Sequence, residues 1–470
     1  MSKNVVLVVM DTARASDTRY IREELSGSSL EKLASEGTDF THAYSNASWT
    51  LPSHTSLFTG TYTSKHGTHA GHKSYDGQFA TLAEVFSEKG YQTVGITNNA
   101  WVTDEFGLSR GFDQFYKVWQ YIQTDTDLGE VKLTSHGTDQ MKKGIAAFLN
   151  GNILANLVNT VYGQFFYRRS DYGAKRTNSI VREWISERDD ENPFFLFINY
   201  LEPHLDYQPP KELAEKFLPK HASYEDAIAI PQKPWEYVSG NLEMSDNDFE
   251  LLQGLYRAEI AYLDQQIGEL RTIFEDYNEW EDTIFVVVGD HGENIGDHGL
   301  MDHQYSLHDT LLHVPLIIQG GSFNRGGKSD SLVQTLDLFP SLLDAINARI
   351  PSYSQGVSIH PNRATPTRRH VFAEYLCPQP AIDRLSEKTD TPRKNLERLD
   401  KKLRAVRTKE HKLVRDSDHN NISVSDPTIT GKLDSELDAW LESFDQASTD
   451  ESIEMSESTK QKLEDLGYLQ

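Results

Sequence analysis

The side chains best suited to chemistry in this chain of 470 residues are carboxylates and an imidazole that directly follow apolar segments. Asp11 follows the run Val5–Met10, and the pair Asp290–His291 comes just after the run Ile284–Val288. Two carboxylates and an imidazole form a ligand set for a hard-to-borderline divalent cation. A single Asp-His-Gly sequence is common in loops, and Asp11 can instead cap a following helix. The metal interpretation is favoured because a carboxylate placed straight after an apolar strand has no structural reason to be there.

A hydroxyl nucleophile is predicted in the segment Ser48–Gly60. Pro52 and the apolar residues after it predict a helix that starts near Thr50 and ends at Gly60. The free N–H groups and the dipole of that helix would surround Thr50 with positive potential. An alkoxide nucleophile and an anionic substrate both need such an environment. On this segment alone, the simpler interpretation is that Thr50 is an N-cap.

Four apolar runs that stop at polar residues predict the β-strands that would position these residues. Such short runs, rich in β-branched and aromatic residues, suit strands that are covered on both faces. The runs are Val5–Met10, Gln92–Ile96, Phe194–Ile198 and Ile284–Val288. Helical patterns at Thr81–Phe86 and Tyr256–Leu270 lie between them. The alternation predicts an α/β fold with a mainly parallel sheet, in which ligands bind at the carboxyl ends of the strands.

The remaining segments predict two insertions and a smaller subdomain. Residues 124–169 and 206–250 are polar and irregular, and we expect both to act as lids. After Asn347 the character changes, and Val371–Tyr375 and Leu403–Arg407 predict strands of a small second sheet.

The predicted organisation is therefore a catalytic domain at residues 1–350 and a C-terminal α+β subdomain at 351–470. The subdomain ends in an acidic tail, whose last helix is expected near Leu463–Leu469.

Composition excludes several classes of function. Acidic residues outnumber basic ones by 71 to 46, and the formal charge of −25 argues against binding nucleic acid or anionic membranes. A salt-adapted host is one explanation for this charge, although ordinary acidic enzymes also reach it. The single cysteine, Cys377, excludes an intrachain disulfide. Because no apolar segment reaches the roughly 18 residues of a transmembrane helix, we expect a soluble, cytoplasmic protein without membrane insertion.

Several motifs together resemble those of the sulfatase family of the alkaline phosphatase superfamily. Ser48–Gly60 resembles the sulfatase signature, in which Cys or Ser precedes x-Pro-Ser-Arg, and Thr59–Tyr62 with His66–Gly67 extends the match. Further matches follow in family order at Val9–Asp11, Glu202–His204, Gly289–Glu293, Gly296–Leu300, Val314–Ile318, Val333–Pro340 and Leu466–Leu469. The resemblance implies a three-layer sandwich of the alkaline-phosphatase/sulfatase type. It also implies a metal-dependent hydrolase that acts on small-molecule sulfate or phosphate esters.

The resemblance implies a role for each matching residue. Asp11, Asp290 and His291 are expected to hold one divalent ion (Mn, Ca, Mg or Zn), with the Thr50 oxygen as a further ligand. The ion would lower the pKa of the Thr50 hydroxyl and polarise the substrate oxygen. Attack by this hydroxyl would then form a covalent ester on Thr50.

Five further residues are expected to bind or protonate the substrate. His204 aligns with the family's substrate-binding histidine, and His303 falls where sulfatases usually carry a lysine. Either can protonate the leaving oxygen or stabilise its charge. His54 replaces the signature arginine and is placed in the catalytic group. Asn98 falls where another family lysine stands, and with Asn99 it is expected to bind substrate.

The departures from the family pattern favour phosphorus chemistry. Sulfatases oxidise the signature Cys or Ser to formylglycine, whose hydrate expels sulfate through a second hydroxyl, and Thr50 is not such a precursor. A Thr ester is released only when water attacks the central atom, which is easy for phosphorus and difficult for sulfur. The leading hypothesis is a phosphodiester or phosphonate ester hydrolase. The alternatives are a sulfatase that works without formylglycine, a phosphoalcohol transferase and an inactive binding homologue.

A second metal cluster at His66, His69 and His72 is a weaker interpretation. These residues are spaced three apart, but Gly67 and Gly71 favour a loop over a helix face. We expect His66 to be structural.

Overall fold

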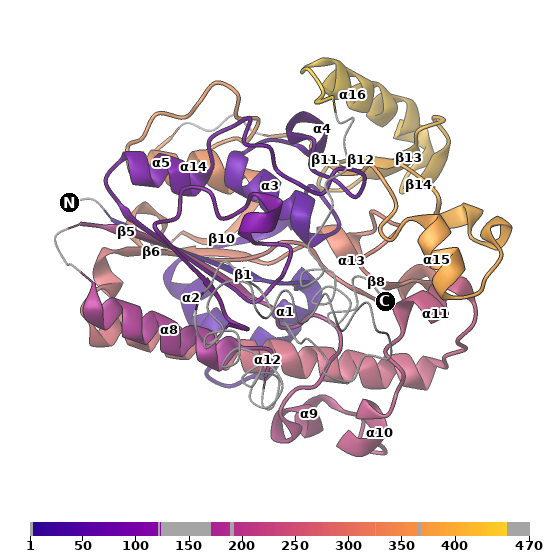
Figure 1. Cartoon of the computed structure of the whole chain (residues 1–470), viewed down its shortest axis with the longest axis horizontal. Coiled ribbons are helices and arrows are strands. Elements are labelled where there is room, and N and C mark those ends of the chain that lie inside the picture. Colours follow the sequence, from indigo (N-terminus) through magenta and orange to yellow (C-terminus); the bar gives the residue numbers. More distant parts are fainter. Residues whose placement is uncertain are drawn as a thin grey trace, which may run out of the picture.

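The computed structural model describes residues 3–120, 123, 171–188, 192–324, 326–363 and 368–448. Its centre is an eight-stranded sheet in the order β10-β2-β9-β6-β1-β5-β3-β4 (Figure 1). The strands are β1 (Asn4–Met10), β2 (Thr38–Tyr44), β3 (Gln92–Thr97), β4 (Gln114–Lys117), β5 (Phe194–Tyr200), β6 (Thr283–Gly289), β9 (Leu316–Gln319) and β10 (Gly327–Gln334). All pairings are parallel except those of β9 with β6 and β2. The predicted parallel sheet and its four apolar strands are therefore confirmed.

Strand register brings the predicted site residues to one edge of this sheet. Met10 at the end of β1 pairs with Tyr200 of β5 on one side and with Gly289 of β6 on the other. Asp11 and Asp290 are the next residues along their strands, so both leave the sheet at the same edge. Parallel strands place their carboxyl ends together in this way.

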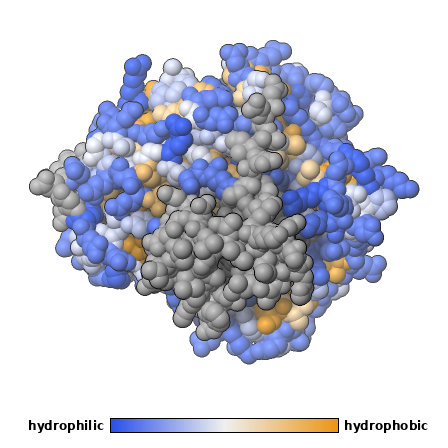
Figure 2. Space-filling model, in the orientation of Figure 1, coloured by the Kyte–Doolittle hydropathy of each residue, from blue (hydrophilic) through white to orange (hydrophobic). Residues whose placement is uncertain are grey.

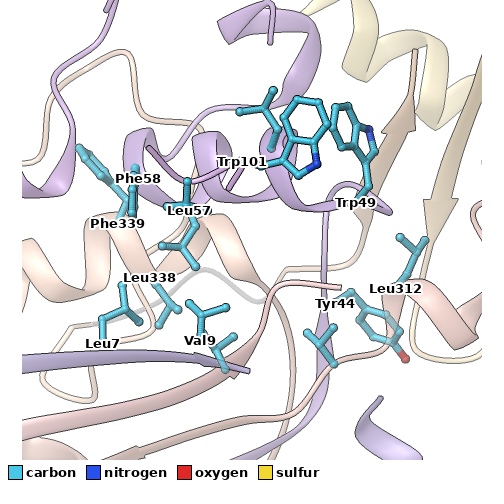
Figure 3. Close-up of a cluster of buried hydrophobic side chains, with 14 of the residues drawn as sticks. Leu7, Val9, Tyr44, Trp49, Leu57, Phe58, Trp101, Leu312, Leu338 and Phe339 are labelled. Carbon is cyan, nitrogen blue, oxygen red and sulfur yellow. The ribbon is translucent and has the colours of Figure 1, made fainter. Parts of the chain in front are cut away.

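Alternate residues of β1 enter two hydrophobic cores, one on each face of the sheet. Leu7 and Val9 belong to the core shown in Figure 3, whereas Val6 and Val8 belong to the other. One face is covered by α3 (Thr50–Thr59), α5 (Leu82–Glu88) and α14 (Leu338–Ala345). The opposite face is covered by α1 (Ala15–Glu24), α2 (Ser29–Glu36), α8 (Ala174–Glu187) and α12 (Asp246–Asp276) (Figure 1). This is the expected three-layer sandwich, and it explains the continuous apolar strands.

Helix α3 has the bounds that the sequence predicted. It begins at Thr50 and ends before Gly60, whose φ of 66° is in the left-handed region that glycine favours. A Cβ at Gly60 would lie 2.7 Å from the ring of Phe339, so side-chain packing also requires glycine there. The packing of Gly60 against Phe339 fixes the C-terminal end of α3 in the core, and this also fixes the position of Thr50 at its N-terminal end.

The segment 206–250 is more ordered than predicted. It contains the short helices α9 (Lys211–Phe217), α10 (Tyr224–Ile228) and α11 (Pro234–Ser239), so the expectation of an irregular insertion is wrong there. These helices are set by local caps and not by long apolar periodicity. Ser223 forms a capping box with Asp226, and Pro234 begins α11. The other predicted insertion, 124–169, lies outside the described residues, and the lid roles stay predictions.

A second, four-stranded antiparallel sheet follows the central one. It consists of β11 (Val371–Tyr375), β12 (Leu403–Arg407), β13 (Lys412–Asp416) and β14 (Asn421–Val424). Helix α16 (Thr430–Glu442) packs on it through a small core that includes Val406, Leu413 and Leu437. Both strands predicted for this region are confirmed. The boundary at residue 350 stays a prediction, and the helix expected at Leu463–Leu469 lies outside the described residues.

The surface agrees with the strongly acidic composition. The face seen in Figure 2 is mostly hydrophilic, with small scattered apolar spots. Among the helices that the structure describes, none has the length and apolar character needed to cross a bilayer. A cytoplasmic location stays a prediction.

Candidate active site

Three groups far apart in the sequence meet at the carboxyl edge of the central sheet. The possible ligand atoms of Asp11, Asp290 and His291 all lie within 4.8 Å of one another. His291 Nε2 is 3.3 Å from Asp290 Oδ2 and 3.9 Å from Asp11 Oδ1. All three side chains are completely buried. This is the geometry of a site for one small cation.

The imidazole of His291 is oriented for ligation. Its Nδ1 lies 2.9 Å from the carbonyl oxygen of Gly292. A carbonyl only accepts hydrogen bonds, so Nδ1 carries the proton and donates. The lone pair is therefore on Nε2, the nitrogen that faces Asp11 and Asp290, as a metal-ligating histidine requires.

In each of the two aspartates, one carboxylate oxygen accepts hydrogen bonds from the protein, and the other oxygen accepts none from the described residues. Asp11 Oδ2 accepts a hydrogen bond from Asn99 Nδ2 at 2.6 Å. Asp290 Oδ1 accepts from the backbone N–H groups of Thr12 at 3.2 Å and His291 at 2.8 Å. Asp11 Oδ1 and Asp290 Oδ2 have no hydrogen-bond partner within the described part of the chain. Buried polar atoms are rarely left in this state, and a divalent cation between the two oxygens would satisfy both.

The shifted pKa values of these three groups also indicate that the site would be stabilised by a bound cation. Burial raises the pKa of Asp11 to about 7. Burial also raises the pKa of Asp290, and the negative charge of Asp11 adds to the effect. Burial lowers the pKa of His291, which keeps the imidazole neutral. Metal ligands must be deprotonated, so a cation here would bind in competition with protons on the two aspartates.

Thr50 points its hydroxyl into this cluster. Its Oγ1 lies 3.3 Å from His291 Nε2 and 3.4 Å from Asn99 Nδ2. The N-cap of α3 is Trp49, with extended backbone and no side-chain cap hydrogen bond. Thr50 is therefore the first residue of the helix, and the N-cap interpretation of this threonine is wrong. The hydroxyl is buried beside the positive end of the helix dipole, where an alkoxide is stabilised.

His54 lies one turn along α3 and links Thr50 to Asp290. Its Nδ1 is 3.0 Å from the Thr50 carbonyl oxygen and 3.4 Å from Asp290 Oδ2. Burial lowers the pKa of His54 to about 4, so the ring is neutral at pH 7. A neutral imidazole does not supply the positive charge of the arginine that the sulfatase signature carries at this position.

Two more buried histidines stand beside the cluster. The ring centroid of His303 is 4.5 Å from that of His291 and 5.3 Å from that of His204. Burial opposes a charge on His303, but Asp302, whose Oδ1 is 2.6 Å from Nδ1, and Glu293 raise its pKa well above the usual value. The raised pKa favours the protonated form of His303, the form that can donate a proton.

The two predicted asparagines point in different directions. Asn99 reaches both Asp11 and Thr50. The amide nitrogen of Asn98 instead donates to Thr177 Oγ1 at 2.9 Å and to the Asn199 carbonyl at 3.0 Å. The structure therefore brings Asn99 to the predicted nucleophile and uses Asn98 to join β3 with β5 and α8.

Two further carboxylates lie at the site: Glu293, which belongs to the predicted cluster motif but was given no role, and Asp302, which was not predicted. Both are buried, and their carboxylates lie near His303 Nδ1. Glu293 belongs to the Gly-Asp-His-Gly-Glu motif, which was a usable signal, whereas Asp302 has no motif of its own. His66, His69 and His72 form no three-ligand group among the residues that the structure places, and His66 Nε2 lies 2.9 Å from Ser56 Oγ.

Comparisons with known proteins identify the family of this chain. The family model for sulfatases matches residues 3–348. An arylsulfatase of Clostridium perfringens is 25% identical over 380 residues, covering 76% of this chain and 78% of that protein. Human iduronate 2-sulfatase is 23% identical over 412 residues, with 76% and 71% covered.

Solved structures share the fold at low sequence identity. A phosphonate monoester hydrolase of Agrobacterium radiobacter superposes with a TM-score of 0.64 at 17% identity, covering 94% of this chain and 95% of that one. A protein solved in complex with its substrate D-glucosamine-2-N,6-O-disulfate superposes with a TM-score of 0.66 at 18% identity, covering 94% and 97%.

Proposed function

Because the chain belongs to the sulfatase family of ester-bond hydrolases, we propose that it cleaves phosphate diesters or phosphonate esters through a covalent intermediate on Thr50. The observation that supports this proposal is the position of Thr50 Oγ1, 3.3 Å from His291 Nε2 at the start of α3. A threonine hydroxyl, and not a cysteine or serine that could become formylglycine, occupies the nucleophile position.

The donor set fits one divalent cation. Asp11, Asp290 and His291 would hold it, with the Thr50 oxygen as a further ligand. When bound, the ion lowers the pKa of the Thr50 hydroxyl and polarises the substrate oxygen. The carboxylate and hydroxyl oxygens suit Mn, Ca and Mg, whereas the imidazole suits Zn, so all four ions are candidates for this site.

In the proposed reaction, side chains of the protein supply the nucleophile and transfer the protons. Thr50 Oγ1, whose proton has passed to solvent, forms a bond to phosphorus as the bond to the alcohol oxygen breaks. The His303 imidazolium donates a proton to the departing alcohol, and His204 lies in the same wall of the site. Water then attacks phosphorus and gives one proton to the neutral His303, and Thr50 Oγ1 departs as the alkoxide, which restores the starting state. Asn99 holds Asp11 and contacts Thr50 throughout both steps.

The second candidate is a sulfatase that works without formylglycine. It is favoured by the two sulfatases that the chain resembles in sequence. It is opposed by the chemistry of release, because a sulfated threonine has no second hydroxyl through which sulfate can be eliminated.

A panel of esters separates the two candidates. The purified protein, loaded with each of the four ions, is assayed on an aryl sulfate, an aryl phosphate, a bis-aryl phosphate and an aryl phosphonate. We expect diesterase or phosphonate esterase activity, and a phosphoryl or phosphonyl group on the Thr50 peptide after acid quenching. Sulfate release that exceeds phosphorus-ester cleavage by orders of magnitude would overturn the choice of phosphorus.

Thr50→Ala is expected to lower kcat/KM by about 10³-fold or more, as loss of a covalent nucleophile does in other hydrolases. The matched control is Thr55→Ala, on the next turn of the same buried helix, whose hydroxyl donates to the Leu51 carbonyl and has no catalytic role. Activity that survives in Thr50→Ala would contradict the covalent route.

A further inference from the structure

We propose that Lys73 and Lys402 bind a second anionic group, carried by the alcohol part of the ester that is cleaved at Thr50. The inference deepens the proposed function, on which it rests, by adding a class of substrate. Three observations support it: two lysines without an ion-pair partner, a segment that lies against both of them, and ring contacts that connect Lys73 with Thr50.

Two half-buried lysines lack a negatively charged partner. Lys73 and Lys402 form no hydrogen bond or ion pair with the residues that the structure describes. Lys117 and Lys412 have side chains that are also largely buried, and they pair with aspartates at 2.7 and 2.8 Å. A charge that is partly removed from water is unfavourable without a counter-charge. A bound anion would supply one to Lys73 and Lys402.

The charges that surround these two lysines are mainly positive. Burial, followed by the positive charge of Arg384, lowers the pKa of Lys73 to about 8. Burial also lowers the pKa of Lys402, and the positive charge of Arg404 adds to the effect. Glu374 opposes this second shift, but its carboxylate already accepts a hydrogen bond from Arg404 at 3.1 Å. Lys73 is therefore still charged at pH 7, in a place where an anion would be attracted.

The thiol of Cys377 lies next to both lysines. The charges of Lys73 and Lys402 both act to lower its pKa, although burial raises it above the usual value. Gly71 packs on the same thiol, since a Cβ at Gly71 would lie 3.6 Å from Cys377 Sγ. One lysine comes from the loop after α4 (Thr63–His66), and the other comes directly before β12. Segments far apart in the sequence thus contribute one lysine each to the same place.

Two ring contacts connect Lys73 with the nucleophile. Lys73 Nζ lies 5.6 Å from the centroid of the Trp101 ring. Trp101 packs edge-on against Trp49, with ring centroids 5.4 Å apart (Figure 3). Trp49 directly precedes Thr50, and the backbone N–H of Trp101 donates to Asn99 Oδ1 at 2.9 Å. Two aromatic rings therefore separate Lys73 from the nucleophile, a separation that the alcohol part of a small-molecule ester can span.

The segment 377–384 also lies on the side from which the alcohol departs. The hydroxyl of Tyr305 donates to the Pro380 carbonyl at 3.1 Å. Tyr305 is two residues after His303, the proposed proton donor to the departing alcohol. The segment thus contacts the loop of Lys73 at one end and the neighbourhood of His303 at the other. An alcohol that receives its proton from His303 would lie along this segment, toward the two lysines.

Matched esters with and without a carboxylate test this proposal. The manganese-loaded protein is assayed on diphenyl phosphate and on bis(4-carboxyphenyl) phosphate, because an ionised carboxylate at this position changes the acidity of the phenol little. We expect kcat/KM to be about 10-fold higher for the carboxylated ester, mainly through KM, as one hydrogen bond to a charged group provides. A formal charge of −25 would otherwise disfavour the more anionic ester. A wild-type protein without this preference would overturn the proposal.

Variants assign the preference to the two lysines. Lys73→Met and Lys402→Met should each lower the ratio of the two kcat/KM values toward one. The matched control is Lys65→Met, because Lys65 Nζ also lies over an aromatic ring, 5.7 Å from the centroid of Phe79, but donates to the Tyr353 carbonyl at 2.7 Å. This control should keep the wild-type ratio. If Lys73→Met and Lys402→Met fold, as circular dichroism would show, and both keep the preference, the assignment is wrong.

Binding of two acids that cannot be hydrolysed separates this proposal from the proposed function. Isothermal titration calorimetry of the manganese-loaded protein compares phenylphosphonate with 4-carboxyphenylphosphonate and needs no turnover. We expect the carboxylated acid to bind about 10-fold more tightly to the wild type and to lose this advantage in Lys73→Met. This result without cleavage of any ester would support the anion site and reject the hydrolase chemistry. Equal binding of both acids by the wild type would overturn the anion site alone, and this comparison needs no variant that folds.

Discussion

Buried charged side chains are paired in the C-terminal sheet, whereas those at the carboxyl edge of the central sheet are only partly paired. In the C-terminal sheet, Arg415 of β13 is 3% exposed and pairs with both Asp434 and Asp438 of α16. At the edge of the central sheet, Asp11 and Asp290 are more deeply buried, and each keeps one oxygen without a hydrogen-bond partner in the part of the chain that the structure describes.

Charged groups that pair with each other within the protein stabilise the fold, whereas buried charged groups of one sign are suited to binding a ligand of the opposite charge. An arginine between two aspartates is compensated by the protein itself, and its removal affects mainly folding. Two buried aspartates that face each other repel and resist ionisation, as the raised pKa of Asp11 shows. Carboxylates with such raised pKa values beside a hydroxyl and an imidazole mark a candidate functional site.

The largest expected effect comes from Asp290→Asn. The change removes one ligand charge, so affinity for the divalent ion and kcat/KM should both fall, the latter by about 10³-fold or more. Titration of the chelator-stripped protein with Mn²⁺, followed by assay at saturating ion, measures both. Wild-type affinity in this variant would mean that the ion binds elsewhere.

A smaller loss is expected from Asn99→Ala, which removes the donor that holds Asp11 Oδ2 at 2.6 Å. Groups that orient a metal ligand typically contribute about 10–100-fold in affinity or activity. The comparison variant is Asn98→Ala, whose amide contacts Thr177 and not Asp11. An equal loss of metal affinity in both variants would show that Asn99 has no specific role.

The pH dependence of stability should differ between the metal-free and metal-loaded protein. Asp11 has a raised pKa, near 7, so between the unfolded value of about 3.8 and this pKa the folded state binds more protons than the unfolded state. The free energy of unfolding of the metal-free protein therefore falls as pH rises through this window. A bound cation keeps Asp11 deprotonated and removes the penalty.

Melting curves from pH 5 to 8, with chelator or with Mn²⁺, measure this effect. The gap between the two melting temperatures should widen by a few degrees as the pH rises to about 7. Asp11→Asn should abolish the widening. A gap that is independent of pH in the wild type would show that Asp11 does not compete with protons for the ion.

The smallest functional effect is expected in the C-terminal sheet. Arg415→Met breaks the pairs with Asp434 and Asp438 and should lower the free energy of unfolding by about 1 kcal/mol, because the two carboxylates are 39% and 48% exposed and stay hydrated. Urea denaturation measures the change. Manganese affinity should stay at the wild-type value, and a loss of affinity would contradict the separation of the two regions.

The strands and the helix at the nucleophile could be predicted because their signals are local. Apolar runs that end at Asp11 and Asp290 are strands buried on both faces, and Pro52 and Gly60 mark α3. Helices α9 to α11 were missed because they depend on caps such as that of Ser223 and not on a repeated apolar pattern.

Other parts of the site could not be predicted because they depend on side-chain directions and on strand register, which the sequence does not reveal. Asn98 and Asn99 are adjacent and equally polar, but the chain bends at Asn98 directly after β3, and only Asn99 faces Thr50. Asp302 joins the site through the register of the hairpin between β7 (Asn294–Ile295) and β8 (Met301–Asp302), strands of only two residues each. Such short strands carry no periodic signal.

The central claim is that the unpaired oxygens of Asp11 and Asp290 meet at a cation beside Thr50. Crystals grown with Mn²⁺ and measured at a wavelength where manganese scatters anomalously test it most directly. The account predicts an anomalous peak within coordination distance of Asp11 Oδ1, Asp290 Oδ2 and His291 Nε2, with Thr50 Oγ1 facing it. Manganese found only at the acidic surface, with these four atoms free of it, would contradict the account.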